Sequence, residues 1–227
     1  MTAGAGAAAE PSVLSIETPS GLARAHVYSA DRTSGDGTPA ARPAIAVVLG
    51  HGAGGGVTAR DLVAVRDVAL DEGIGVALVE QPYRVAGRRS PAPARQLDLA
   101  WRAVVERLRI EPFRGAGLIC GGRSSGARVA CRTAADTGAV GVLCLAFPLQ
   151  PPGRSASGEP RPDRLSELDA VRVPVLVVQG ESDQFGMPPA RRGRRRVVIV
   201  PGDHALRTVE PVRKGVRPWL RRMRDRG

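Results

Sequence analysis

Short apolar runs alternate along this chain with longer segments in which apolar residues recur every three to four positions, the period of a helix. Uninterrupted apolar runs are typical of strands that a parallel sheet buries on both faces. They cover residues 44–49, 75–79, 117–120, 140–147, 173–179 and 196–200. Two further strand-like segments, 12–17 and 23–28, precede them.

The segments with helical periodicity cover residues 58–71, 95–109, 125–136 and 206–224. Pro211 and Pro218 are the points at which the last helix is expected to be interrupted. Strands that alternate with helices and are joined by right-handed crossovers predict an α/β fold, a mostly parallel central sheet with helices on both faces. The chain of 227 residues fits one such domain over residues 12–227, after a flexible tail over residues 1–11.

Composition adds information on the core and the compartment. Apolar residues make up 43% of the chain and aromatic residues only 3%, so the core must consist mainly of aliphatic side chains. No apolar run reaches the roughly 18 residues of a membrane span, and the first residues lack the features of a secretory signal. Cys120, Cys131 and Cys144 lie in apolar or helical segments without metal-ligand spacing. We therefore expect a cytoplasmic protein with buried free thiols, no metal and no membrane span.

The net charge of +11 is the unusual bulk property, and arginine supplies almost all of the cations. The arginines are concentrated in residues 191–196 and 213–226. Neither cluster has interleaved aromatic residues or helix-turn-helix spacing, so we expect a solvated basic face and no nucleic-acid partner. An acidic or nucleic-acid partner remains the alternative interpretation.

A serine lies where an apolar run meets a helical segment. Residues 122–126 read G-x-S-x-G with Ser124 at the centre. This pattern is typical of a nucleophile elbow, a sharp turn from strand to helix that exposes the serine at its apex. The flanking glycines, Gly122 and Gly126, are needed because a strained turn leaves no room for a Cβ beside the strand and the helix. We predict that Ser124 is a nucleophile.

A serine nucleophile needs a histidine base and an acid, which in such a fold follow the serine in the order acid, then histidine. His204 is the only histidine after Ser124, and it follows the last predicted strand. Asp183 follows the preceding strand and is our predicted acid, while Glu181, nearer the strand end, is the alternative. The imidazole would accept the serine proton, and the carboxylate would orient the imidazole.

A second glycine-rich turn, residues 50–56, follows the first buried strand. Its glycines allow backbone N–H groups to approach a substrate oxygen, and we assign the oxyanion donors as the amides of Ala53 and Ser125. A phosphate-binding loop is the rival interpretation, but the turn lacks the G-K-[ST] ending. Other residues at the same edge of the sheet are expected to contact substrate or shape its site. They are His51, Gly52, Tyr83, Arg84 and Arg123, of which the two arginines would bind an acidic group or pair with nearby carboxylates.

Together, the His-Gly turn at residues 51–54, the Ser124 elbow, Asp183 and His204 resemble the α/β-hydrolase superfamily. The phrases at residues 81–84, 121–124 and 179–180 are more narrowly similar to its compact dienelactone-hydrolase-like branch without a cap domain, and within it to the testis-expressed, KANL-type predicted hydrolases. The resemblance implies a Ser124–Asp183–His204 triad, and a short loop over residues 148–162 where larger relatives carry a lid. We expect this loop to be mobile over the site.

Our hypothesis is a monomeric or homodimeric serine hydrolase that cleaves a small-molecule acyl ester or thioester through an acyl-enzyme on Ser124. This chemistry requires no cofactor. The alternative is a non-catalytic module of the same fold that uses its basic surfaces for binding or regulation.

Overall fold

The computed structural model describes residues 10–29, 43–151, 153 and 162–226. The expected tail over residues 1–11 therefore falls almost wholly outside the described residues, as does the centre of the loop expected over residues 148–162. The single domain expected over residues 12–227 stays a prediction.

An eight-stranded sheet forms the centre of the described structure, in the order β1-β2-β4-β3-β5-β6-β7-β8. The strands are β1 (Ser12–Thr18), β2 (Gly21–Tyr28), β3 (Ile45–Gly50), β4 (Gly75–Glu80), β5 (Gly117–Arg123), β6 (Gly141–Leu145), β7 (Val175–Gly180) and β8 (Arg195–Val200). β2 runs antiparallel to both of its neighbours, β1 and β4. All pairs among the other strands, β3 to β8, are parallel. The mostly parallel sheet expected from the apolar runs is confirmed.

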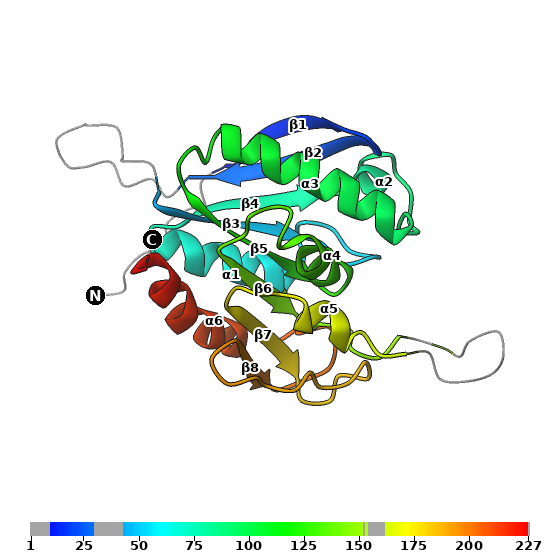
Figure 1. Ribbon diagram of the computed structural model, residues 1–227, viewed down its shortest axis with the longest axis vertical. Helices are drawn as coiled ribbons and strands as arrows, with labels where there is room; N and C mark the ends of the chain where they lie inside the picture. The colour runs from blue at the N-terminus through cyan, green and yellow to red at the C-terminus, as the bar shows by residue number, and fades with distance from the viewer. Residues whose placement is uncertain (1–9, 30–42, 152, 154–161, 227) are drawn as a thin grey trace.

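Helices cover both faces of the sheet, as Figure 1 shows. They are α1 (Arg60–Asp71), α2 (Pro82–Val85), α3 (Ala94–Ile110), α4 (Ser125–Thr133), α5 (Leu165–Asp169) and α6 (Val209–Arg224). α3 and α4 pack on one face, where Trp101 is fully buried in the first core cluster. α1 and α6 pack on the other face through a second cluster that includes Leu62 and Leu220. Every helix in the described ranges is too short or too polar to cross a membrane.

The expected interruption of the last helix is wrong, because α6 runs continuously through Pro211 and Pro218. Pro211 lies in the first turn, where a backbone N–H has no acceptor within the helix and its loss costs little. Pro218 is exposed, and its neighbours Trp219 and Leu220 are buried against the sheet. Packing of this apolar side holds the helix together where one hydrogen bond is missing.

Candidate active site

Ser124 occupies the turn between β5 and α4, and its backbone is strained. Its φ of 50° and ψ of −107° lie in a region that residues with a side chain rarely adopt. The turn needs close backbone contact, since a Cβ on either Gly122 or Gly126 would overlap the carbonyl oxygen of Gly50 on β3. The predicted strand-turn-helix context of Ser124 is therefore present.

His204 and Asp183 lie beside Ser124 at the carboxyl edge of the sheet. The Nε2 atom of His204 is 3.0 Å from the Oγ atom of Ser124. On the other side of the ring, Nδ1 is 2.9 Å from the Oδ2 atom of Asp183. The sheet brings the three together because β5, β7 and β8 run in parallel, so that the segments after them meet at one edge. Asp183, and not the exposed Glu181, supplies the carboxylate that meets the histidine.

The Asp183 carboxylate is buried and fully supported by hydrogen bonds. The backbone N–H of Phe185 donates to Oδ1 over 2.9 Å, and the side-chain amide of Gln179 donates to Oδ2 over 2.8 Å. Gln179 itself is held in place, because its Oε1 atom accepts a hydrogen bond from the N–H of Phe147. This contact determines which end of the amide faces Asp183.

Phe185 also contacts the histidine directly. Its ring packs edge to face against the imidazole of His204, with 4.5 Å between the ring centroids. An aromatic contact of this kind limits the rotation of the imidazole. The roles of Gln179 and Phe185 were missed in the sequence, where the one signal was an amide side chain at the end of an otherwise apolar strand.

The glycine-rich turn after β3 is held rigidly by its neighbours. The Nδ1–H group of His51 donates to the carbonyl oxygen of Gly52 over 2.8 Å, and the N–H of Gly55 donates to the same oxygen over 3.1 Å. The Gly52 carbonyl and the Ala53 N–H belong to the same planar peptide group. Hydrogen bonds that fix this carbonyl therefore also fix the direction of the Ala53 N–H. Neither this N–H nor that of Ser125 has a hydrogen-bond partner within the described part of the chain. Both predicted donors are thus available to a ligand.

His51 and Tyr83 support this turn from behind. The backbone N–H of Gln81 donates to the Nε2 atom of His51 over 3.1 Å, so the imidazole is neutral with its proton on Nδ1. Burial lowers the pKa of His51 below its usual value. The hydroxyl of Tyr83 donates to the carbonyl oxygen of Ala53 over 2.9 Å, and burial raises the pKa of this phenol to about 12. At neutral pH the Tyr83 phenol therefore keeps the proton that it donates, and the His51 ring stays neutral, so that Nε2 can accept from Gln81.

Arg123 is engaged within the protein. Its Nε atom lies 2.9 Å from the buried carboxylate of Asp61 on α1, and its Nη2 atom donates to the carbonyl oxygen of His204 over 2.9 Å. Burial raises the pKa of Asp61, while the positive charge of Arg123 opposes that effect. Of the two roles expected for Arg123, the structure shows pairing with a nearby carboxylate. The other role, a contact with substrate, stays a prediction.

Arg84 and Gly52 complete the set of predicted site residues. Arg84 is half-buried in α2, close enough to Tyr83 and His51 to influence the pKa of both. A Cβ on Gly52 would lie 3.7 Å from the Cβ of Ser124, so the backbone of the turn passes directly beside the serine. Among the described residues, no three His, Cys, Asp or Glu side chains are grouped so that they could hold a metal ion.

Comparison with known proteins identifies the family of this arrangement. A family model described as an alpha/beta hydrolase domain matches residues 43–210, and no curated protein sequence matches the chain. A serine hydrolase without lid, XC6422 from Xanthomonas campestris, has a similar structure with a TM-score of 0.63 at 20% identity, over 92% of this chain and 95% of that one. Est1E from Butyrivibrio proteoclasticus gives a TM-score of 0.70 at 14% identity, over 93% and 98% of the two chains.

Proposed function

Because the chain belongs to the alpha/beta hydrolase family, we propose that it is a serine hydrolase which cleaves small acyl esters or thioesters through an acyl-enzyme on Ser124. The observation that carries this proposal is the unbroken hydrogen-bonded series from Ser124 through His204 to Asp183. The three groups have the order, spacing and atom pairing that activation of a serine hydroxyl requires.

The proposed reaction begins with transfer of the serine proton. With Nδ1–H donating to Asp183, the Nε2 atom of His204 is unprotonated and accepts the proton of the Ser124 hydroxyl as Oγ attacks the substrate carbonyl. The imidazolium then gives this proton to the leaving group as the tetrahedral intermediate collapses to the acyl-enzyme. A water molecule, deprotonated by the same imidazole, releases the acid and restores the serine.

The negative charge that develops on the substrate oxygen would be stabilised by the N–H groups of Ala53 and Ser125. Their support is the fixed turn at Ala53 and the start of α4 at Ser125, because neither N–H has a hydrogen-bond partner among the described residues. Removing one such donor typically reduces kcat by about 10²- to 10³-fold.

Several narrower assignments belong to the same proposal. They are the dienelactone-hydrolase-like branch and its KANL-type members, a cytoplasmic location, and a monomeric or homodimeric state. We propose a compact substrate site, with Tyr83 and Arg84 beside the oxyanion turn.

Covalent labelling tests the proposal. We expect a fluorophosphonate probe to label the wild-type protein, and a short-chain p-nitrophenyl ester to be hydrolysed. In Ser124→Ala both should be lost, with kcat reduced at least about 10⁴-fold. Ser166→Ala, which changes an exposed serine on α5, is the matched control and should behave as wild type.

Labelling that persists in Ser124→Ala would assign the nucleophile elsewhere. A folded wild-type protein that neither reacts with the probe nor hydrolyses esters would instead favour the non-catalytic binding module.

A further inference from the structure

A groove with a volume of about 580 Å³ lies at the end of the sheet opposite Ser124. It is formed by the amino ends of β7 and β8, the turn that precedes β8 and the last turns of α6. Asp183 and His204 follow the carboxyl ends of the same two strands, so this groove is separate from the candidate active site. Its volume lies in the range of small-molecule sites, about 300–1,000 Å³.

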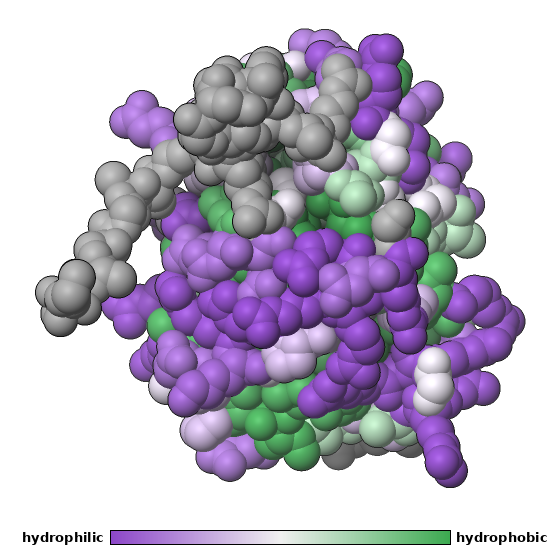
Figure 2. Space-filling view, turned by 90° about the vertical axis from the view of Figure 1, so that its left-hand side faces the viewer, coloured by the Kyte–Doolittle hydropathy of each residue, from purple (hydrophilic) through white to green (hydrophobic). Residues whose placement is uncertain are grey.

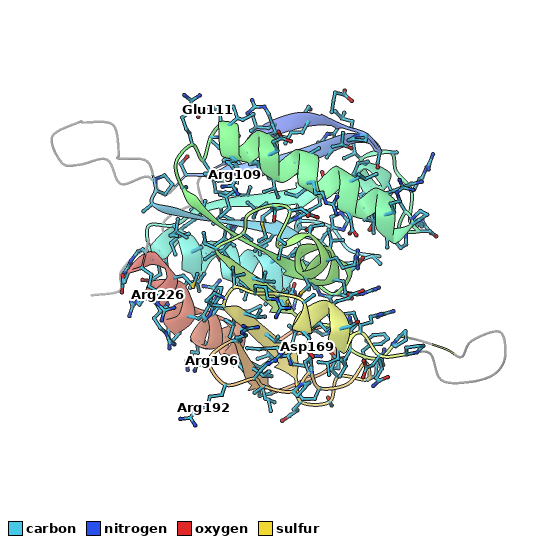
Figure 3. The ribbon with its side chains drawn as sticks, viewed as in Figure 1. Arg109, Glu111, Asp169, Arg192, Arg196 and Arg226 are labelled. Carbon is cyan, nitrogen blue, oxygen red and sulfur yellow. The ribbon has the colours of Figure 1, made fainter. Side chains whose placement is uncertain are left out.

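Arginine side chains without acidic partners surround the groove. Five of the arginines that line it are exposed and have no ion pair within the described residues: Arg192, Arg194, Arg196, Arg222 and Arg226. Figure 3 shows Arg192, Arg196 and Arg226 on the same side of the molecule, at the ends of β8 and α6. Figure 2 shows the face on that side, where hydrophilic side chains gather around a smaller apolar area.

Other arginines of the same two segments have acidic partners. Arg217, Arg221 and Arg224 all contact Glu72, the residue that follows α1, and Arg195 is 3.1 Å from Asp169. The five arginines at the groove that have no acidic partner among the described residues repel one another. This repulsion disfavours their grouping unless a negative charge offsets it. A bound anion would offset it.

The floor of the groove is apolar. Val175 and Met223 are buried there, and Trp219 lines it with 5% of its surface exposed. Guanidinium groups match the oxygens of a phosphate with paired hydrogen bonds, whereas an apolar floor favours contact with an uncharged, weakly hydrated part of a ligand. The two together fit a molecule with charged phosphates at one end and a base at the other.

We propose that this groove binds a small molecule that carries at least two phosphate groups, of the nucleotide di- or triphosphate class. A small ligand fits better than a nucleic-acid strand, because the arginines surround one bounded hollow and the described surface offers no exposed aromatic side chain on which successive bases could stack. Binding here is independent of the ester hydrolysis proposed for Ser124.

Calorimetric titration at low ionic strength with four probes tests the chemistry. ATP and inorganic pyrophosphate should bind, whereas adenosine should bind at least about tenfold more weakly, since the arginines recognise phosphate. Raising the salt from about 0.05 M to about 0.5 M should weaken binding, because screening reduces the attraction of exposed charges. Pyrophosphate should also change the tryptophan fluorescence, since Trp219 lines the groove and Trp101 is fully buried elsewhere.

Charge reversal tests the location. Arg222→Glu with Arg226→Glu should weaken ATP binding at least about tenfold, as the loss of charge-assisted hydrogen bonds predicts. Arg192→Glu with Arg194→Glu, on the turn before β8, should do the same if the α6 variant does not fold. Arg60→Glu with Arg95→Glu makes the same change at two exposed arginines outside the groove and should leave binding within about twofold of wild type.

Three results would overturn the proposal. The first is that neither ATP nor pyrophosphate binds at low salt. The second is equal weakening by the groove variants and the control variant, which would indicate attraction to net charge alone. The third is binding of a single-stranded oligothymidylate, the fourth probe, without binding of ATP or pyrophosphate, which would assign the arginines to nucleic acid.

Discussion

The buried carboxylate of Asp183 depends on one neutral side chain, Gln179. The amide of Gln179 is fully buried, and its orientation is fixed because the Phe147 N–H occupies its oxygen. Its nitrogen therefore donates to the same Asp183 oxygen that accepts the hydrogen bond of His204. A carboxylate oxygen held by two donors keeps its direction, which the imidazole needs for correct alignment with Ser124.

Gln179→Leu removes this support without adding charge. We expect kcat for ester hydrolysis to fall about 10- to 100-fold, the range for loss of a hydrogen bond to a charged group. KM should change little, since the side chain is remote from bound substrate. Gln96→Leu, at an exposed position on α3, is the control. An unchanged kcat in a Gln179→Leu protein of wild-type stability would show that Asp183 does not need this donor.

At the residue scale, the sequence could name three side chains that the structure brings together, because chemistry limits the choice. Ser124, Asp183 and His204 could be selected because few side chains of those types follow a predicted strand in the required order. Arg123 could not be assigned, because nothing near it in the sequence indicates Asp61 as its partner. Gln179 and Phe185 were missed because the contacts that hold them, with Phe147 and with His204, come from other segments of the chain.

At the scale of elements, the elbow depends on how closely β3, β5 and α4 approach one another. α4 contacts β3 across Gly126, where a Cβ would overlap the Gly50 carbonyl oxygen. The backbone of Gly126 does not have a positive φ, so its conformation would allow other residues. Glycine is required at this position because there is no space for a Cβ. The close approach sets where α4 begins and therefore where the Ser125 N–H points.

Gly126→Ala tests this contact. We expect the free energy of unfolding to fall by about 1–3 kcal/mol, the usual cost of overpacking, and ester hydrolysis to fall with it as α4 shifts. Gly56→Ala is the matched control, because nothing lies within 4 Å of a Cβ at that position. Urea denaturation of both variants measures the difference. Equal stability of the two would contradict a requirement for close packing at the elbow.

Element prediction succeeded where burial leaves a clear pattern. The central strands are apolar on both faces, so each run could be read directly from the sequence. α2 and α5, with four and five residues, are too short to show a helical period and were missed. The continuity of α6 was missed because its stability comes from packing against the sheet, which a proline rule does not include.

At the scale of the whole molecule, the pairing of charges could not be predicted from the net charge of +11. Sequence alone indicated a solvated basic face over residues 213–226. The structure divides that segment into arginines that join α6 to α1 and arginines that line the groove. Glu72, at the end of α1, is the centre of the first group, with its side chain only 4% exposed.

The helix pair α1–α6 should therefore depend on the ionisation of Glu72. The hydrogen bond from Arg221, together with that from Arg217, lowers the pKa of Glu72 below its usual value of 4.5. A carboxyl group whose pKa is lower in the folded state stabilises the protein above the unfolded value, and this contribution is lost as the pH falls through the folded value. Protonation of Glu72 in acid should consequently weaken the attachment of α6.

Glu72→Gln separates this effect from the rest of the acid response. At pH 7 we expect the variant to have a Tm about 2–4 °C below wild type, as the loss of about 1 kcal/mol predicts for a chain of this length. Below pH 4.5 the two proteins should converge, because the wild-type carboxyl group becomes neutral as well. Glu106→Gln, at an exposed position on α3, should match wild type throughout. A Tm difference that stays constant from pH 7 to the acid limit would mean that Glu72 acts through shape and not through charge, since only the charge is removed by protonation.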